Sequence, residues 1–327
     1  MMLKSAGFFC LAFCEIGIGM TLFDKPALDV PAQLKQWQGR GLVVEDELRA
    51  QHYLAVVGYY RLSAYSLPFQ LGNPEHHFIT DTSFDDIFDL YAFDRELRLL
   101  VLDAIERIEV SMRSGIGNYM ATKYGAHWYL NESHFAYSYD HKVLLADIEL
   151  HCKRKKELFV KHYTVKYSSP RLPPSWVVME LLTFGQLSMI YDRMANACDQ
   201  KAIARLFGTQ AELLRSWLQT LSYMRNVCAH HSRLWNRELG NAPKVPKKSP
   251  SNWIKWPIEV SDDNIRPHVR LYLVLVVIEF LLQSINPESS WHQRLFELMH
   301  KYNRVSKAHM GMPEEWSTDS FWRLSEE

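Results

Sequence analysis

The sequence lacks several features that assign a protein to a common class at once. It has no net charge, because its 327 residues contain 37 Lys and Arg against 37 Asp and Glu, so no general attraction to nucleic acid is expected. It has no Gly-rich phosphate loop, no internal repeat, no low-complexity tract and no alternation typical of strands. The five Cys lack the paired spacing of a disulfide framework or a zinc site. This cysteine pattern favours a protein of the reducing cytoplasm.

Long hydrophobic runs are also scarce. Residues 1–19 carry one lysine before an apolar run, but Glu15 interrupts that run and it is too short to cross a bilayer. We expect these residues to be an ill-ordered extension or a mis-assigned start. The apolar stretch 265–284 contains Arg266, His268, Arg270 and Glu279, which favours a core helix over a membrane span. We therefore expect no membrane partner.

Helical periodicity dominates the rest of the chain, in which 47% of residues are hydrophobic and 13% aromatic. Ser83, followed by Asp85 and Asp86, predicts the start of a helix that runs to about Tyr119. Further helices are expected from Pro31, from about Glu45, and over 140–166, 175 onward, 185–195, 199–207, 210 onward, 265–284 and 290–302. The sequence therefore predicts an all-α fold without a significant sheet.

Charged side chains fall on the apolar stripe of the long helix that starts at Ser83. At 100° per residue, Glu106, Glu109 and Arg113 lie on or beside this stripe, and Glu109 with Arg113 has the i,i+4 spacing of an ion pair. We hypothesise that Glu106 or Glu109 orients a functional side chain on a neighbouring helix. A purely structural ion network is the alternative.

The most informative stretch is residues 225–237, which read RNVCAHHSRLWNR. An apolar helix face leads into it, and continuing that helix places Arg225 in the middle of the face. A buried arginine needs an ion pair, a subunit interface or an anion. Arg225, Asn226 and His230 are the candidate catalytic residues, with His231 and Arg233 in support.

The spacing of Arg225 and His230 is not unusual in itself. Arg304 and His309 are separated by the same interval, and a structural arginine with an incidental histidine is the simpler interpretation of either pair. The following amide, the aromatic and basic residues and the amphipathic helix distinguish Arg225 and His230.

Local basic patches are the candidate contacts for nucleic-acid phosphates in this neutral chain. The first lies in a predicted helix and the second in a Pro- and Lys-rich loop at 239–262, whose tryptophans could also stack on bases. A third candidate is Arg61, which lies among aromatic residues that we expect to be mainly core. The predicted RNA-binding residues are Arg61, Lys153, Arg154, Lys155, Lys156, Lys247 and Lys248.

Four segments together resemble the Abi-like proteins, a bacterial abortive-infection family placed in the HEPN superfamily of helical nucleases. They are GYYRLSAYSLPF at 58–69, FDRELRLLVLDAIERIEVSMRS at 93–114, PPSWVVMELLTFGQLSMIY at 173–191 and the stretch at 225–237. The resemblance implies a HEPN-like helical bundle with additional N-terminal helices. It places an Abi-like domain at 20–310, with its HEPN core at about 84–300 and a C-terminal tail at 311–327.

The resemblance further implies a metal-independent endoribonuclease of anti-phage defence, without a cofactor. The ribose 2′-hydroxyl would attack the phosphate, His230 would act as general acid or base, Arg225 would hold the phosphate and Asn226 would position one of them. Five residues along an ideal helix set Arg225 and His230 about 140° and 7.5 Å apart. They meet only if the helix bends or ends near Ala229, if the arginine curls, or if two subunits share the site. We therefore expect a homodimer, and a toxin–antitoxin arrangement with a protein or RNA antitoxin stays open.

Two other functions stay open at this point. The chain could be a non-catalytic RNA-binding or phage-sensing module in which Arg225 only grips phosphate. A metal hydrolase using His230, His231 and His134 or His162 is disfavoured, because adjacent helical histidines point about 100° apart and no carboxylate has ligand spacing.

Overall fold

The computed structural model describes residues 26–72, 74–154, 157–248, 250, 252–255, 257–258 and 265–323. The extension expected at 1–19, and the predicted phosphate contacts Lys155 and Lys156, lie outside these residues. Within them the fold is all-α, as the sequence predicts: twelve α-helices are present, and strand-like pairing is limited to three isolated bridges. The HEPN-like detail of the fold stays a prediction.

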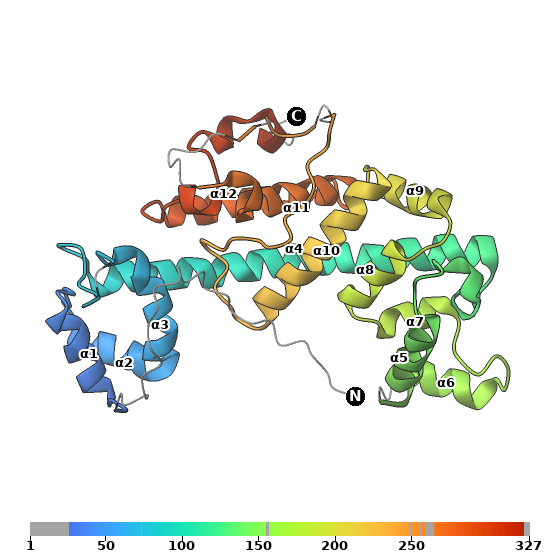
Figure 1. Cartoon of the computed structure of the whole chain (residues 1–327), viewed down its shortest axis with the longest axis horizontal. Helices are drawn as coiled ribbons and strands as arrows, with labels where there is room; N and C mark the ends of the chain where they lie inside the picture. Colours follow the sequence, from blue (N-terminus) through green and yellow to red (C-terminus); the bar gives the residue numbers. More distant parts are fainter. Residues whose placement is uncertain are drawn as a thin grey trace.

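Helix α4 (Phe84–Tyr124) is the axis of the molecule (Figure 1). Its 41 residues correspond to a rod of about 60 Å. Ser83 and Asp86 form a capping box, in which the Asp86 amide donates to Ser83 Oγ at 3.1 Å and the Ser83 amide donates to Asp86 Oδ2 at 2.9 Å. The predicted start is confirmed, and the helix continues one turn beyond the predicted end.

Three helices pack at the N-terminal end of α4: α1 (Val30–Gly39), α2 (Glu47–Val57) and α3 (Tyr59–Ser66). We call residues 26–90, which comprise these helices and the first turns of α4, the N-terminal lobe. Trp37 of α1 is fully buried there against Phe78 and Phe84. This aromatic contact fixes the lobe to the start of α4.

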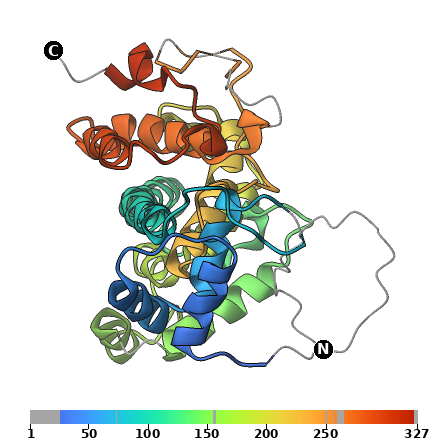
Figure 2. The same cartoon turned by 90° about the vertical axis from the view of Figure 1, so that its left-hand side faces the viewer.

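A second lobe lies at the other end of α4. Helices α5 (His141–Arg154) and α6 (Leu158–Lys166) occupy the span predicted as one helical region, and α7 (Ser175–Leu181) joins them to α4. We call residues 141–171 the α5–α6 lobe. Figures 1 and 2 show that both lobes lie on the same side of α4, opposite α11 and α12.

The remaining helices complete the core around the middle of α4. Helices α8 (Phe184–Asp192), α9 (Ala197–Leu206) and α10 (Ala211–Ala229) lead to the stretch at 225–237. Helix α11 (Leu271–Ile285) has twelve buried residues and packs on α4 with α12 (Trp291–Lys301), so the expectation of a core helix is confirmed. No helix of the described residues has the length and apolar content to span a bilayer.

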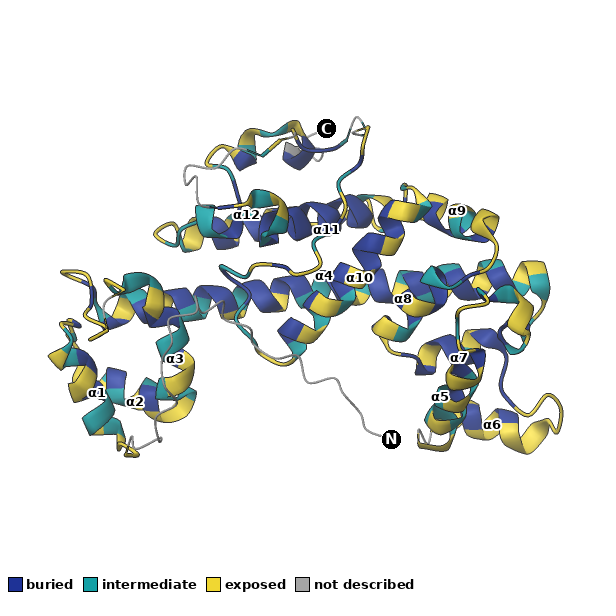
Figure 3. Cartoon of the chain, viewed as in Figure 1, coloured by how far each residue is buried: buried dark blue, intermediate teal, exposed yellow. Residues whose placement is uncertain are grey.

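The segment from 311 was predicted as a tail, yet its aromatic side chains are part of the core. Trp316, Phe321 and Trp322 are buried, and Trp322 Nε1 donates to the hydroxyl of Tyr272 at 3.1 Å. The packed structure therefore extends to this segment (Figure 3). Short 3-10 helices complete the chain at Leu67–Phe69, Trp128–Leu130, Glu132–His134, Pro267–Val269, Ala308–Met310, Trp316–Thr318 and Ser320–Arg323.

Candidate functional site

Helix α10 carries the first half of the candidate site and ends inside it. Its apolar face buries Leu214, Trp217, Leu218 and Leu221, as the spacing predicts. The last helical residue is Ala229; His230 follows as the C-cap, and its amide donates to the Asn226 carbonyl at 3.0 Å. The helix thus ends at the position where the sequence geometry allows Arg225 and His230 to approach one group.

Arg225 is less buried than the helical pitch suggests. Its side chain is only half-buried, whereas Met224 and Cys228 on the same helix are buried. Figure 1 shows the reason: the C-terminal end of α10 extends past α4, toward the side of the two lobes. Among the described residues, no helix therefore covers the middle of the apolar face of α10 at its last turn.

The side chains predicted to be catalytic have few partners. Arg225 Nη1 contacts only the neighbouring Asn226 Oδ1, at 3.4 Å, and Asn226 and His230 are exposed. His231 is also exposed and adopts a left-handed backbone, with φ of 56°. No described residue forms an ion pair with Arg225, so its charge is available to an anion.

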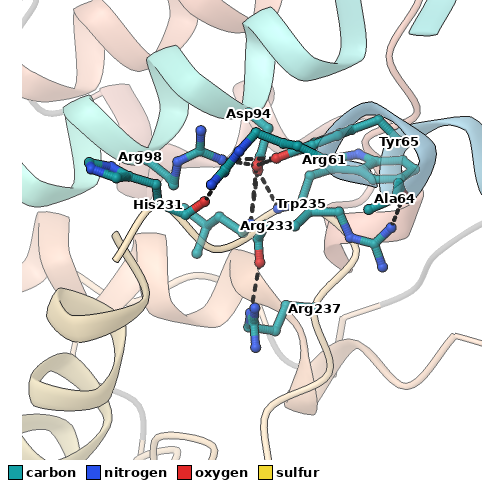
Figure 4. A network of polar contacts seen from close by, with 10 residues as sticks. Arg61, Ala64, Tyr65, Asp94, Arg98, His231, Arg233, Trp235 and Arg237 are labelled. Atoms are coloured by element: carbon teal, nitrogen blue, oxygen red, sulfur yellow. Dashed lines mark hydrogen bonds and ion pairs between the residues drawn. The ribbon is translucent and has the colours of Figure 1, made fainter. Parts of the chain in front are cut away.

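The second half of the stretch is held by a buried carboxylate from α4. Asp94 is fully buried and forms an ion pair with Arg98 one turn later. It also accepts a hydrogen bond from the Tyr65 hydroxyl at 2.6 Å, and from the backbone amides of Leu234 at 3.0 Å and Trp235 at 2.6 Å (Figure 4). Burial raises the pKa of Asp94, while Arg98 and the other donors oppose that shift.

Further hydrogen bonds fix the same loop to its surroundings. Arg61 Nη1 of α3 donates to the His231 carbonyl at 2.7 Å, and Arg233 donates to the carbonyl of Ala64. On the other side, Arg270 Nη1 donates to Asn236 Oδ1 at 2.9 Å, and Trp235 Nε1 donates to the Ser306 carbonyl at 2.9 Å. Figure 4 shows the His231 ring pointing away from Asp94 while its carbonyl faces Arg61. The network therefore holds the backbone and leaves the imidazole out.

The predicted supporting residue Arg233 has a different role from the one expected. Arg233 is half-buried and anchors the loop to α3, so it is not a free cation. Burial lowers the pKa of Arg233, and nearby Tyr65 and Asp94 oppose that shift. Its contribution to the site is to place the loop that follows His230.

The predicted ion pair of Glu109 and Arg113 is present, with Arg113 Nη2 and Glu109 Oε1 2.5 Å apart. Arg113 also donates to the carbonyls of Met179 and Leu182, both at 3.1 Å, so the pair holds the C-terminal end of α7 against α4. Glu106 is exposed and makes no hydrogen bond or ion pair with described residues. The hypothesis that Glu106 or Glu109 orients Arg225 or His230 is therefore wrong, and the structural alternative holds for Glu109.

Asp94 is the residue that sequence reasoning missed. A signal existed, because Asp94 and Arg98 have i,i+4 spacing and lie among buried positions between Phe93 and Val101. That spacing reveals the ion pair but not Leu234 and Trp235, which lie 140 and 141 residues away.

The predicted phosphate contacts are scattered over the molecule. Arg61 lies beside the site, through its bond to His231, and is exposed. Lys153 and Arg154 are exposed at the end of α5 in the other lobe. Lys247 and Lys248 are exposed in the loop after α10, and Lys248 lines a shallow hollow with Gln210 and Leu213 at the N-terminal end of that helix. The 19 residues of α10 separate this hollow from His230 by about 28 Å.

The loop at 239–262 offers no base-stacking tryptophan at Trp253, contrary to the expectation. Trp253 is buried and stacks on Trp217, with ring centroids 5.7 Å apart and an interplanar angle of 6°. The Trp217 Nε1 also donates to the Lys244 carbonyl at 2.8 Å. Trp253 is thus part of the core packing.

Among the described residues, no three His, Cys, Asp or Glu side chains come together as ligands of a metal ion would. The thiol nearest the site, Cys228, is buried, and burial raises its pKa to about 12. The raised pKa favours the protonated thiol at neutral pH.

Comparison with protein families matches residues 52–236 to the family described as Abi-like protein. Neither the curated proteins nor the solved structures give a match. The matched region covers more than half of the chain and contains Arg61, Asp94, Arg225 and His230. The chain belongs to the Abi-like protein family.

Proposed function

We propose that this protein is a metal-independent endoribonuclease that acts in abortive infection. Membership of the Abi-like family indicates the role in abortive infection. The observation that carries the nuclease proposal is the contrast within one segment: half-buried Arg225 and exposed Asn226 and His230 stand at a helix end whose following loop is fixed by buried Asp94. Placing reactive groups on a rigid support is what catalysis requires.

The proposed chemistry is transfer of an RNA phosphate to the neighbouring ribose oxygen. A base removes the proton of the 2′-hydroxyl, the oxygen bonds to phosphorus, and the bond to the 5′ oxygen breaks as an acid protonates it. His230 supplies one of these two transfers, because the ordinary pKa of an imidazole lies near neutrality. Arg225 neutralises the charge that builds on the phosphate, and Asn226 positions the phosphate or the imidazole. The products are a 2′,3′-cyclic phosphate and a 5′-hydroxyl.

A second copy of the chain completes the site in this proposal. His230 can perform only one of the two proton transfers in a given step, and Asn226, His230 and His231 at the end of α10 are exposed, so a partner can contact them. We propose a homodimer in which the two helix ends contribute to one substrate-binding region.

The substrate in this proposal is RNA in the cytoplasm. Arg61 is the phosphate contact best placed for it, because its guanidinium already lies against His231 and stays exposed. Lys153, Arg154, Lys247 and Lys248 are exposed but remote, so they would act on distant phosphates only. A nuclease toxic to its own cell needs restraint at rest, so an antitoxin, protein or RNA, is part of the proposal.

The test compares RNA cleavage by the wild type with His230→Ala and Arg225→Ala, in the presence of a chelator. The proposal predicts cyclic-phosphate and 5′-hydroxyl ends from the wild type and loss of cleavage in both variants. His300→Ala is the matched control, because His300 is an exposed histidine of α12, away from the site.

The same variants separate the proposal from a non-catalytic RNA-binding or phage-sensing module. In a nuclease, His230→Ala abolishes cleavage and toxicity and retains RNA affinity. A binding module keeps its biological activity in His230→Ala and loses it in Arg225→Ala, where the phosphate contact is removed. That second pattern would reject the enzymatic proposal.

A further inference from the structure

The two lobes carry opposite charge although the chain as a whole is neutral. The N-terminal lobe (26–90) contains nine acidic and four basic residues, a formal charge of −5. The α5–α6 lobe (141–171) contains eight basic and three acidic residues, a formal charge of +5. Glu45, Asp46 and Glu47 are exposed at the start of α2, and Lys161 and Lys166 are exposed on α6. Charges of opposite sign are thus concentrated at the two ends of α4.

The same two lobes hold most of the exposed apolar surface. Of the 21 large hydrophobic side chains that are exposed among the described residues, eight lie between 28 and 79 in the N-terminal lobe and six lie between 143 and 167 in the α5–α6 lobe. Leu48 is 82% and Tyr60 is 91% exposed in the first lobe, and Leu158 is 81% and Val165 is 88% exposed in the second. Exposed apolar side chains gathered among charges of one sign are typical of a protein interface.

The arrangement of the lobes makes them suitable for the same partner. Both project from one side of α4, at its two ends, and the exposed end of α10 lies between them (Figures 1 and 2). A second copy turned by 180° about an axis perpendicular to the view of Figure 1 brings its α5–α6 lobe opposite the first copy's N-terminal lobe. The same rotation brings its N-terminal lobe opposite the first copy's α5–α6 lobe. A twofold axis makes these two contacts identical.

We propose that two copies of this chain associate through reciprocal contacts between the N-terminal lobe of one copy and the α5–α6 lobe of the other. Apolar side chains form the centre of each contact, and the opposite charges of the two lobes form its rim. A stable interface of about 1,200–2,000 Å² divides between the two contacts, so each needs only half of that area. The alternative dimer, with like lobes in contact, sets −5 against −5 and +5 against +5 and is repulsive.

This contact also decides between two uses of the basic α5–α6 lobe. A phosphate-binding surface requires cations but has no use for Leu158 or Val165, which are apolar and more than 80% exposed. A protein partner uses both the cations and the apolar groups. The contact encloses the two copies of His230 and Arg225 in one space, a consequence that rests on the proposed function, whereas the association itself does not.

Charge reversal tests the contact. The first variant carries Glu45→Lys and Glu47→Lys on the N-terminal lobe, the second carries Lys161→Glu and Lys166→Glu on α6, and the third carries all four substitutions. The oligomeric state of the full chain is measured by light scattering at several protein and salt concentrations. Circular dichroism and thermal melting confirm that each variant is folded.

The proposal predicts a wild-type dimer that weakens at high salt, and dissociation constants raised ~10-fold or more in the first and second variants. Mixing these two variants favours the mixed dimer, because one of its two contacts then joins the two unchanged lobes, −5 against +5. The four-substitution variant leaves only −1 against +1 in each contact and dimerises most weakly, whereas a dimer of like lobes would gain stability because its repulsion falls from −5 against −5 to −1 against −1.

A matched control carries Lys247→Glu and Lys248→Glu, which change the same charge outside both lobes and leave the dimer intact. Leu158→Ser with Val165→Ser removes the apolar centre without changing charge and should weaken the dimer. This variant carries the test if the charge-changed chains do not fold. A monomeric wild type at every concentration overturns the proposal. So does a second variant that stays dimeric and loses affinity for RNA, since the α5–α6 lobe would then be a phosphate surface. None of these readouts involves cleavage, so failure here leaves the nuclease proposal standing.

Discussion

The two halves of the stretch at 225–237 are treated in opposite ways by the fold. From Leu234 onward the chain is bound by buried Asp94, by Arg270 and through the indole of Trp235. Among the described residues, the polar side chains of Arg225, Asn226, His230 and His231 form no hydrogen bond beyond the one between Arg225 and Asn226, while the backbone of His231 is held by Arg61. The difference indicates a division of work: one half supplies rigidity and the other supplies reactive groups.

The energetic scale of the two halves differs accordingly. Removing one partner of a buried ion pair costs about 3–5 kcal/mol, whereas a surface substitution away from such features changes stability by about 0.5 kcal/mol or less. Substitutions in the first half should therefore affect chemistry, and those around Asp94 should affect folding.

The largest effect on stability is expected for Asp94→Ala. It leaves Arg98 buried without its counter-ion and removes the acceptor of Tyr65, Leu234 and Trp235. The free energy of unfolding, measured by denaturant titration, should fall by about 3–5 kcal/mol. Asp94→Asn keeps the shape and one acceptor and should lose less. An Asp94→Ala chain as stable as the wild type would contradict the claim that Asp94 anchors the segment from Leu234 onward.

Arg225→Ala should leave stability within about 0.5 kcal/mol of the wild type, because no ion pair or buried contact is lost. Cleavage should fall by about 10²–10³-fold, the usual cost of removing one group that stabilises transition-state charge. Initial rates on a defined RNA give this value. Arg304→Ala removes an exposed arginine with the same spacing to a histidine and should cleave normally; equal loss in both variants would show that overall charge, not the site, is responsible.

Glu109→Gln tests whether the second buried ion pair of α4 belongs to the site. Arg113 would keep its bonds to Met179 and Leu182 and lose its charged partner, so unfolding should become easier by about 1–3 kcal/mol. The cleavage rate per folded molecule should be unchanged. A selective loss of cleavage would revive the orienting role that the contacts of Glu109 contradict.

The smallest stability change among the anchors is expected for Arg61→Ala. The bond to the His231 carbonyl lies at the surface, so its loss should cost roughly 0.5–1.5 kcal/mol. Because Arg61 joins the N-terminal lobe to the backbone beside His230 and is also the proposed phosphate contact, cleavage and RNA affinity should both fall relative to a surface control. Michaelis constants and turnover rates, compared with those of Lys35→Ala on the exposed surface of α1, measure this difference.

The sequence predicts the elements around the site better than their contacts. The capping residues at Ser83 and the apolar spacing of α10 are local signals, and both helices form where expected. The half-burial of Arg225 could not be predicted. Helical pitch gives the direction in which its side chain points from α10, but not that α10 extends past α4 at its last turn. The partners of Asp94 are equally hidden, since a buried carboxylate on a stripe demands donors without naming them. Trp253 shows the same limit. Its position among lysines suggests base stacking, but its ring stacks on Trp217 in the core.

The most direct test of the division between the two halves is the RNA-cleavage rate of His230→Ala, normalised to the folded fraction measured on the same sample. The account predicts unfolding energies within about 0.5 kcal/mol of the wild type and cleavage reduced by about 10²–10⁴-fold. A His230→Ala chain that is fully folded and cleaves RNA at the wild-type rate would contradict it.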